Sequence, residues 1–382
     1  MKYFKKVLKN GLRVVIIPMK DNPTVTVLVL VEAGSKYEEK KSNGISHFLE
    51  HMCFKGTIKR PRAITGYYAK SDARHFRQIF DIVSDIYLNS TFPEVEAQKE
   101  KGVIIEEINM YEDMPQKHVQ DLFMKLLYGD QPTGWNITGE KKNILNMKRD
   151  DFVNYHKKHY LPEATVLIVA GQVTEKEVIS EVNKIFGKVL RGEKGHKLKI
   201  REIQKKPHTL INFKKTDQTH FILGVRTYGL FNKKNVILSV LGGVLGGGMS
   251  SRLFVKLREE MGVGYYVRAY NDSYTDHGFL QISAGVDNKR IDEVVRAVLE
   301  ECKKLKNHKV PKDELDKVKE FLIGNMKLTL ESSDDIANFY GGQELLKREM
   351  EGAEEKAKKI RKITANQVQT LAKNIFLRIL KF

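Results

Sequence analysis

The residue types and spacing in HFLEH, residues 47–51, are those of a metal-binding helix. His47 and His51 are four residues apart, so they share one face of a helix and can offer two imidazole nitrogens to one ion. Two imidazoles, one carboxylate and an open fourth position are the usual ligand set of a hydrolytic zinc site. Zinc would lower the pKa of a water molecule, and Glu50, beside the pair, would accept the proton.

This motif is the reverse of HExxH and matches the H-x-x-E-H signature. The alternative interpretation is that His47 and His51 are two ordinary polar residues on the solvent side of a structural helix. A chance match in a chain with this histidine content has odds of roughly one in fifty. The motif therefore favours zinc over an ordinary exposed helix.

The third ligand should come from a second helix, and EKGVIIEEINMYED is the candidate. Glu100 and Glu107 are seven residues apart, which is two turns, so they share a face. Val103, Ile104 and Ile108 indicate that part of this helix is buried, and a buried carboxylate needs a partner such as a metal. The alternative is a charged face that lies beside a core stripe.

The elements that must position these residues alternate along the chain between short β-branched runs and helical apolar spacing. The second half repeats the layout of the first, which suggests duplication. Strands are expected at 12–18, 24–34, 164–171, 208–215, 220–229, 264–273 and 278–287, and helices at 47–51, 74–92, 94–112, 150–160, 174–189 (capped by Thr174), 235–246, 251–262, 290–306 and 312–330.

This order predicts an α+β protein with two homologous domains, each a mostly antiparallel sheet covered by helices. The basic stretch RGEKGHKLKIREIQKK is the best linker candidate. We therefore expect an N-terminal zinc-binding domain at 1–192, a linker at 193–206 and a second domain at 207–382.

Composition narrows the functional classes to which the protein can belong. The 382 residues carry a net charge of +18, but the lysines are interleaved with acidic residues and no nucleic-acid-binding motif is present, so we expect no nucleic-acid partner. No apolar run is long enough to span a bilayer and no signal peptide is recognisable, which predicts a cytoplasmic protein without a membrane partner. Cys53 and Cys302 are too few and too far apart for a disulfide framework.

Three segments, GISHFLEHMCFKGT, EKGVIIEEINMYEDMP and SSRLFVKLREEMGVGYYV, resemble the superfamily of inverted-motif zinc metallopeptidases. That superfamily includes pitrilysin, insulin-degrading enzyme and the mitochondrial processing peptidases. The sequence is most similar to short bacterial members with two homologous domains in one chain, and the resemblance extends over nearly the whole chain.

The resemblance implies a role for each candidate residue. It implies that His47, His51 and Glu107 bind Zn²⁺ and that Glu50 is the general base. Glu100 matches a glutamate that lies behind the ligands. In the second half of the chain, the two remaining candidates are Arg258 and Tyr265. They match an arginine–tyrosine pair of the family that holds substrate and stabilises the developing oxyanion.

Members of the family enclose peptides between two bowl-shaped halves, and a chain of this length supplies one half. The resemblance therefore implies a homodimer, or a heterodimer with a related chain, in which Arg258 and Tyr265 serve the partner's zinc. The expected activity is zinc-dependent endopeptidase cleavage of peptides or unfolded polypeptides.

The sequence departs from the family after Thr57. His51 and Glu107 are 56 residues apart, about 20 fewer than the family usually has between them. Members of the family have at this place a helix, a Gly-Gly turn and a strand along which a substrate backbone lies by β-augmentation, and the resemblance implies that this strand is missing here. The enzyme could instead use a neighbouring strand such as TGYYAK, it could be a non-catalytic or weakened partner or scaffold subunit, or the sequence could carry an internal loss.

Overall fold

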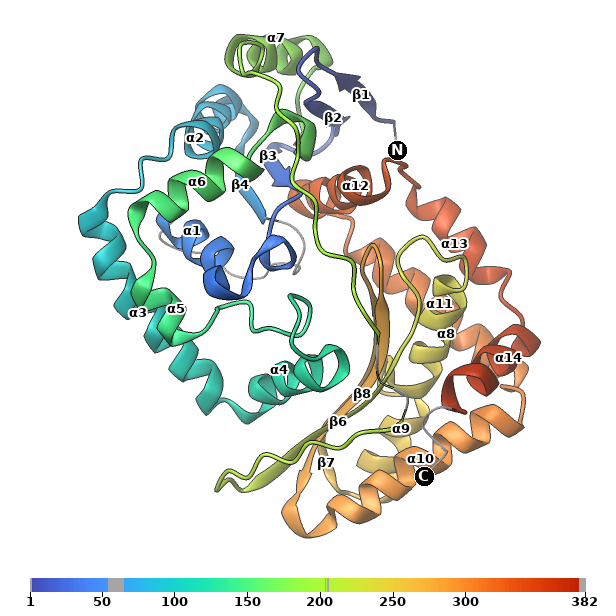
Figure 1. The fold of residues 1–382 in the computed structure, drawn as a ribbon. Helices are drawn as coiled ribbons and strands as arrows, with labels where there is room; N and C mark the ends of the chain where they lie inside the picture. Colours follow the sequence, from blue (N-terminus) through green and yellow to red (C-terminus); the bar gives the residue numbers. More distant parts are fainter. Residues whose placement is uncertain (1, 54–64, 203, 205, 378–382) are drawn as a thin grey trace. The chain divides into compact units, whose positions relative to one another are not determined.

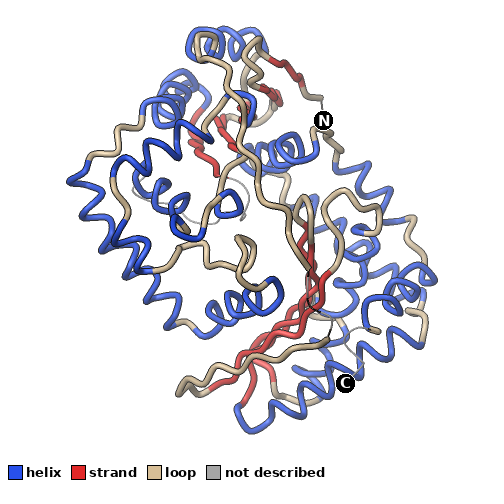
Figure 2. Tube along the Cα trace, in the orientation of Figure 1, coloured by secondary structure: helices blue, strands red, loops and turns tan. Residues whose placement is uncertain are grey.

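The computed structural model describes residues 2–53, 65–202, 204 and 206–377, which form two compact units (Figure 1). Each unit consists of a β-sheet covered by helices, as the colouring by secondary structure shows (Figure 2). This architecture confirms the predicted α+β class. Unit 1 comprises Met1–Met110, Trp135–Leu198 and Lys327–Gly352, and unit 2 comprises Tyr111–Gly134, Lys199–Met326 and Ala353–Phe382.

The described residues of unit 1 form a sheet of five strands in the order β1-β2-β5-β3-β4. Among the described strands of this sheet, only the β2–β5 pair is parallel. The central strands are nearly continuous runs of buried, β-branched residues, as expected for strands covered on both faces. The strands are β1 (Phe4–Val7), β2 (Arg13–Pro18), β3 (Thr24–Val31), β4 (Thr65–Asp72) and β5 (Thr165–Gly171).

The two faces of this sheet pack on different helices, because successive side chains of a strand point in opposite directions. Val27 and Val29 of β3 face a large core, whereas Leu28 and Leu30 face the single helix α12 (Ser333–Lys347). The large core takes its apolar residues from α1 (Ile45–Cys53), α2 (Phe76–Asn89), α3 (Glu94–Asp113), α5 (Lys141–Asn146), α6 (Arg149–His159) and α7 (Glu175–Phe186).

In the described part of unit 2, the sheet is antiparallel, with three strands in the order β6-β8-β7. One face carries most of the core of the unit, and the other packs on α4 (Pro115–Tyr128) through Phe123 and Met124. The strands are β6 (Gln218–Arg226), β7 (Gly264–Ser273) and β8 (Gly278–Asp287), and the helices are α8 (Asn235–Gly246), α9 (Arg252–Phe254), α10 (Ile291–Asn307), α11 (Lys312–Leu328), α13 (Ala353–Arg361) and α14 (Ala365–Phe376).

The compact units do not follow the contiguous division predicted at 192 and 207. Helix α4, from the first half of the chain, belongs to unit 2, and α12, from the second half, belongs to unit 1. Each of these helices covers a sheet face whose apolar side chains would otherwise be exposed. The two halves therefore have corresponding layouts, in which each supplies a covering helix to the other unit.

Most of the predicted elements are present. Strands β7 and β8 have the predicted bounds, and Thr174 caps α7 by accepting a hydrogen bond from the amide of Glu177 at 3.2 Å. The predicted strand at 208–215 is wrong. That segment forms no ladder with any described residue, and its Ile211 and Phe213 are exposed. Alternation is a local signal, whereas a strand also needs a partner.

Two further features bear on function. Strand β4 contains the TGYYAK sequence, and it is the outermost strand of its sheet among the described residues. The shortened stretch that precedes it, at 54–64, lies outside the described residues. Within the described part of the chain, no helix is both long enough and apolar enough to cross a membrane.

Candidate metal centre

Helix α1 carries the histidine pair on the side opposite its core contacts. Ile45, Phe48 and Leu49 are buried in the core of unit 1. Because these apolar positions share one face of the helix, His47 and His51 are left on another face, where both are partly exposed. The amphipathic pattern of this nine-residue helix therefore determines which way the imidazoles point.

Helix α3 presents two of its glutamates, Glu100 and Glu107, to that histidine face. Ile104 and Ile108 are buried in the core, as predicted, whereas Val103 is 52% exposed, contrary to the prediction. Two turns separate Glu100 from Glu107, and both side chains contact histidines of α1. Helix α3 therefore does have a charged stripe beside its core stripe. The charged stripe faces the histidines of α1.

The structure brings four of the predicted residues together. Oε2 of Glu107 lies 3.2 Å from Nε2 of His51 and 3.5 Å from Nε2 of His47. One ligand atom from each of these three residues lies within 4.8 Å of the other two. On the far side of the ring, Nδ1 of His51 donates to Oε1 of Glu100 at 2.9 Å.

The close contacts change the protonation of the cluster. Hydrogen bonds with His47 and His51 hold the pKa of Glu107 well below its usual range. Burial lowers the pKa of His51, but hydrogen bonds with Glu107 and Glu100 outweigh it, so the net shift is upward. Glu107 is therefore a carboxylate at neutral pH, which is the form that binds a cation.

The donor set fits zinc. Two imidazole nitrogens and one carboxylate oxygen form the three-ligand arrangement of hydrolytic zinc sites, with a fourth position left for water or substrate. When the ring of His51 is neutral and its Nδ1 proton is donated to Glu100, Nε2 carries the lone pair that would bind a metal, on the side of the ring that faces Glu107. Such carboxylate–histidine pairs fix the tautomer and orientation of a metal ligand.

The other predicted site residues are placed as follows. Glu50 lies on α1, directly before His51, and is partly exposed. Arg258 and Tyr265 lie in unit 2, each at a local irregularity of the backbone. Arg258 is in a π-helical segment, Val255–Glu260, and donates to the carbonyl of Gly264 at 2.8 Å. Tyr265 lies at a β-bulge in β7 and is 67% exposed.

Bulges of both kinds re-aim side chains and are over-represented at functional sites. Reasoning from the sequence did not foresee either irregularity, and it expected one continuous helix over 251–262. The structure instead has a short α-helical turn, α9, followed by the π-helical segment. The glycines around Tyr265, in GVGYY, were the available signal for a bulge.

Comparison with known proteins identifies relatives over most of the chain. The family model described as insulinase, peptidase family M16, matches residues 13–65 and 62–141, and the model described as the peptidase M16 inactive domain matches 146–322. The first model thus matches in two pieces that meet where the spacing is short. An uncharacterized zinc protease of Bacillus subtilis, YmxG, is 34% identical over 96% of this chain and 94% of its own length.

A further relative and two solved structures are also similar to this chain over most of its length. An uncharacterized zinc protease of Rickettsia bellii is 32% identical over 87% of this chain and 86% of its own. A protease of Helicobacter pylori superimposes with a TM-score of 0.90 at 22% identity, covering 98% of this chain and 96% of that one. A protein of Pseudomonas fluorescens described as a peptidase M16 inactive domain gives a TM-score of 0.88 at 18% identity, covering 98% and 95%. The two solved structures agree in fold, and the matched family models together with the relatives from Bacillus subtilis and Rickettsia bellii show that the chain belongs to the insulinase family of peptidases, M16, of the short bacterial type.

Proposed function

We propose that the protein is a zinc-dependent endopeptidase that hydrolyses peptides or unfolded polypeptides. The observation that carries this proposal is the convergence of His47, His51 and Glu107, with Glu100 holding the far side of the His51 ring. The names of the relatives, which are zinc proteases, support the same activity.

Each candidate residue of this chain would have a separate role in hydrolysis. Zinc held by His47, His51 and Glu107 would supply a Lewis acid and an activated water. Glu50 accepts the proton of the attacking water and later delivers one to the leaving amine. Tyr265, and the guanidinium of Arg258, are donors suited to the substrate carbonyl, where negative charge develops during attack.

Strand β4 is the candidate surface for the substrate backbone. Its outer edge has no partner strand among the described residues, and a peptide in extended conformation could add to it by β-augmentation. This edge would take the place of the strand that the short spacing between His51 and Glu107 is expected to remove. An unfolded or short peptide can adopt the required extended form, whereas a folded protein cannot.

The proposal includes a second chain. The resemblance to enclosed family members, and a length that corresponds to one half of such a chamber, support a homodimer or a heterodimer with a related chain. In that assembly Arg258 and Tyr265 of one protomer serve the metal of the other. The substrate is then enclosed between protomers during cleavage.

The test measures zinc content and cleavage of an unstructured peptide mixture together. Wild type is expected to bind about one zinc per chain and to cleave the mixture. Glu50→Gln should retain zinc and lose cleavage by a factor of about 10² to 10⁴, because only the base is removed. A Glu50→Gln variant that cleaves as fast as wild type would refute the mechanism.

A non-catalytic partner or scaffold role is the second candidate. The short spacing between His51 and Glu107 favours it, as does the family match in two pieces. In this case wild type would not cleave the peptide mixture, but it would still form a stable complex with a related peptidase chain. Zinc content alone does not separate the two functions, so the cleavage assay decides.

A further inference from the structure

The helix that carries the histidine pair begins in an unusual way. The amides of the first turn of a helix need acceptors, and a side chain at the N-cap normally supplies one. Gly44, which precedes α1, has no side chain. Instead, the carboxylate of Glu38 accepts the amide of Gly44 at 2.9 Å and the amide of Ser46 at 3.0 Å.

Glu38 makes two further contacts at the same place. Its Oε2 accepts from Nδ2 of Asn43 at 3.0 Å, and its Oε1 accepts a short hydrogen bond from the hydroxyl of Ser46. The side chain is only 3% exposed. Both oxygens of one buried carboxylate are thus used to hold the three residues that lead into the metal-binding face of α1.

A second segment closes on the same turn from another side. Nδ2 of Asn43 also donates to the carbonyl of Asn136 at 3.0 Å. Gly44 has a φ of +100°, and a Cβ there would lie 2.8 Å from the Cα of Gly139. The start of α1 is therefore held by Glu38 on one side and by the backbone around Gly139 on the other.

We propose that Glu38 is a positioning residue of the metal centre, and this inference rests on the proposed function. Ser46, which Glu38 holds by two hydrogen bonds, is followed directly by His47. The imidazole of His47 must stay in register with that of His51, whose ring centroid lies 4.6 Å away. By fixing the first turn, Glu38 fixes the first ligand relative to the other two.

The burial of Glu38 supports a role beyond ordinary capping. Burial disfavours a charged carboxyl, and it raises the pKa of Glu38. A serine or aspartate at the N-cap would satisfy a first-turn amide at far lower cost. A buried carboxylate with four donors instead gives a rigid, charge-assisted attachment, which a metal ligand on the same turn requires.

The sharpest variant is Glu38→Gln, which keeps the shape of the side chain. The glutamine amide nitrogen would face a donor, either from Gly44 and Asn43 or from Ser46, so part of the attachment must break. We expect zinc to bind about 10- to 100-fold more weakly, as is typical when a supporting residue of a metal site is lost. The visible absorption of the Co²⁺-loaded protein should also change, because it reports the geometry of the ligands.

Glu344→Gln is the matched control. Glu344 is a fully buried carboxylate of the same unit, and it pairs with Lys5 at 2.8 Å rather than with any residue of α1. Its substitution should lower the unfolding temperature and leave both the zinc affinity and the Co²⁺ spectrum as in wild type. A loss of stability alone therefore cannot produce the expected signature of Glu38→Gln.

Zinc dissociation constants are measured by chelator competition on the full chain, well below the unfolding temperature. A wild type that binds no zinc overturns the proposed function and this inference together. A wild type that binds zinc, with a Glu38→Gln variant of equal affinity and unchanged Co²⁺ spectrum, overturns this inference alone. If Glu38→Gln does not fold, Ser46→Ala decides: we expect about threefold weaker binding, and unchanged affinity overturns the inference.

Discussion

Both ring nitrogens of His51 face a carboxylate, Nδ1 that of Glu100 and Nε2 that of Glu107. The two acids raise the pKa of the imidazole together, but only Glu107 is placed to bind a metal as well. Glu100 therefore has two opposite effects. It orients the ring for a metal, and it stabilises the proton that a metal must displace.

The first prediction concerns the pH dependence of zinc binding. Below the raised pKa of His51 a proton competes for the ring, so zinc affinity should rise with pH and level off once the ring is neutral. In Glu100→Gln the rise should occur at lower pH, because one of the raising hydrogen bonds is weakened. Its plateau affinity should be about tenfold lower. Chelator competition between about pH 5.5 and 8 measures both quantities, and an unshifted midpoint would contradict the role of Glu100.

The second prediction concerns acid stability and His159. This buried ring lies 4.4 Å from the ring of Tyr155, and burial lowers its pKa to about 4 from an ordinary 6.5. The unfolded chain gains a proton on this residue as pH falls below 6.5, while the folded chain stays neutral until about pH 4. Stability is therefore lost between those values, by up to about 3 kcal/mol.

His159→Phe removes this titration and keeps an aromatic ring in the same place. Urea unfolding at a series of pH values should show a flatter profile between pH 4 and 6.5 than in wild type. His196→Phe, at an exposed histidine of the same unit, should retain the wild-type slope. Equal slopes in wild type and His159→Phe would show that the ring is not held neutral by the fold.

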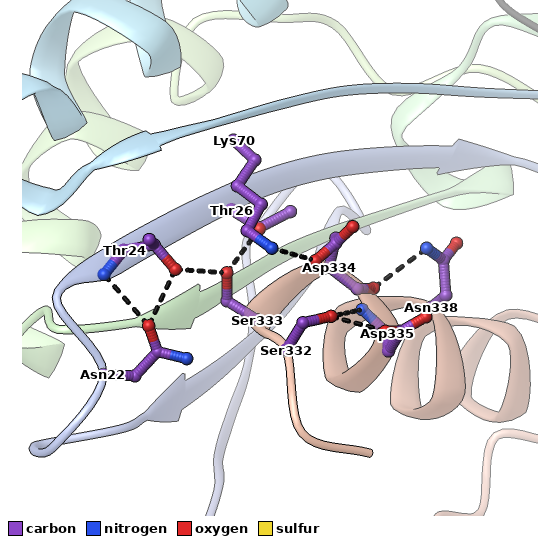
Figure 3. A network of polar contacts seen from close by, with 9 residues as sticks. All are labelled: Asn22, Thr24, Thr26, Lys70, Ser332, Ser333, Asp334, Asp335 and Asn338. Carbon is purple, nitrogen blue, oxygen red and sulfur yellow. Dashed lines mark hydrogen bonds and ion pairs between the residues drawn. The ribbon is translucent and has the colours of Figure 1, made fainter. Parts of the chain in front are cut away.

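At the scale of elements, α12 is attached to the sheet of unit 1 by a polar network as well as by its apolar face (Figure 3). The hydroxyl of Ser333, fully buried, lies 2.9 Å from that of Thr24 and 2.8 Å from that of Thr26. Lys70 of the edge strand β4 pairs with Asp334 at 2.6 Å, in a more exposed position. The helix thus contacts both the central strand β3 and the strand proposed to receive substrate.

The third prediction compares how much the Ser333 contact and the Asp334 contact each contribute to the stability of the protein. Ser333→Ala should destabilise the protein by about 1–3 kcal/mol, because it removes a partner from the fully buried Thr26 hydroxyl. Asp334→Asn breaks an ion pair whose side chains are 34% and 28% exposed, so its cost should be about 0–1 kcal/mol. Urea unfolding of both variants gives the comparison, and a larger loss for Asp334→Asn would reverse the assigned order.

The elements also show which parts of the fold and site could be predicted. The histidine pair and the pair formed by Glu100 and Glu107 each lie within a single helix. Their spacing alone therefore predicted that the two members of each pair share a face. It did not reveal Glu38, because an acid seven residues before the first residue of a helix has no periodic signal. The lack of a side chain at Gly44 was the available hint, since the first turn then needs an acceptor from elsewhere.

At the scale of the whole molecule, long-range packing decides features of the fold that local sequence patterns do not predict. Helices α4 and α12 have apolar faces, but the pattern does not say which sheet each covers, and each covers the sheet of the other half. Residues 208–215 have a strand's alternation but no ladder partner among the described residues. In both cases the outcome depends on whether residues far away in the sequence supply a packing or ladder partner.

The last prediction tests the proposed assembly by mixing two inactive variants. If Tyr265 serves the metal of the partner, a dimer of one Glu50→Gln chain and one Tyr265→Phe chain contains one complete site. Random reassociation of equal amounts should then restore about a quarter of the wild-type sites, since half of the dimers are mixed and each has one intact site of two. If Tyr265 instead serves the metal of its own chain, no combination contains an intact site, and the mixture should cleave the peptide no faster than either variant alone.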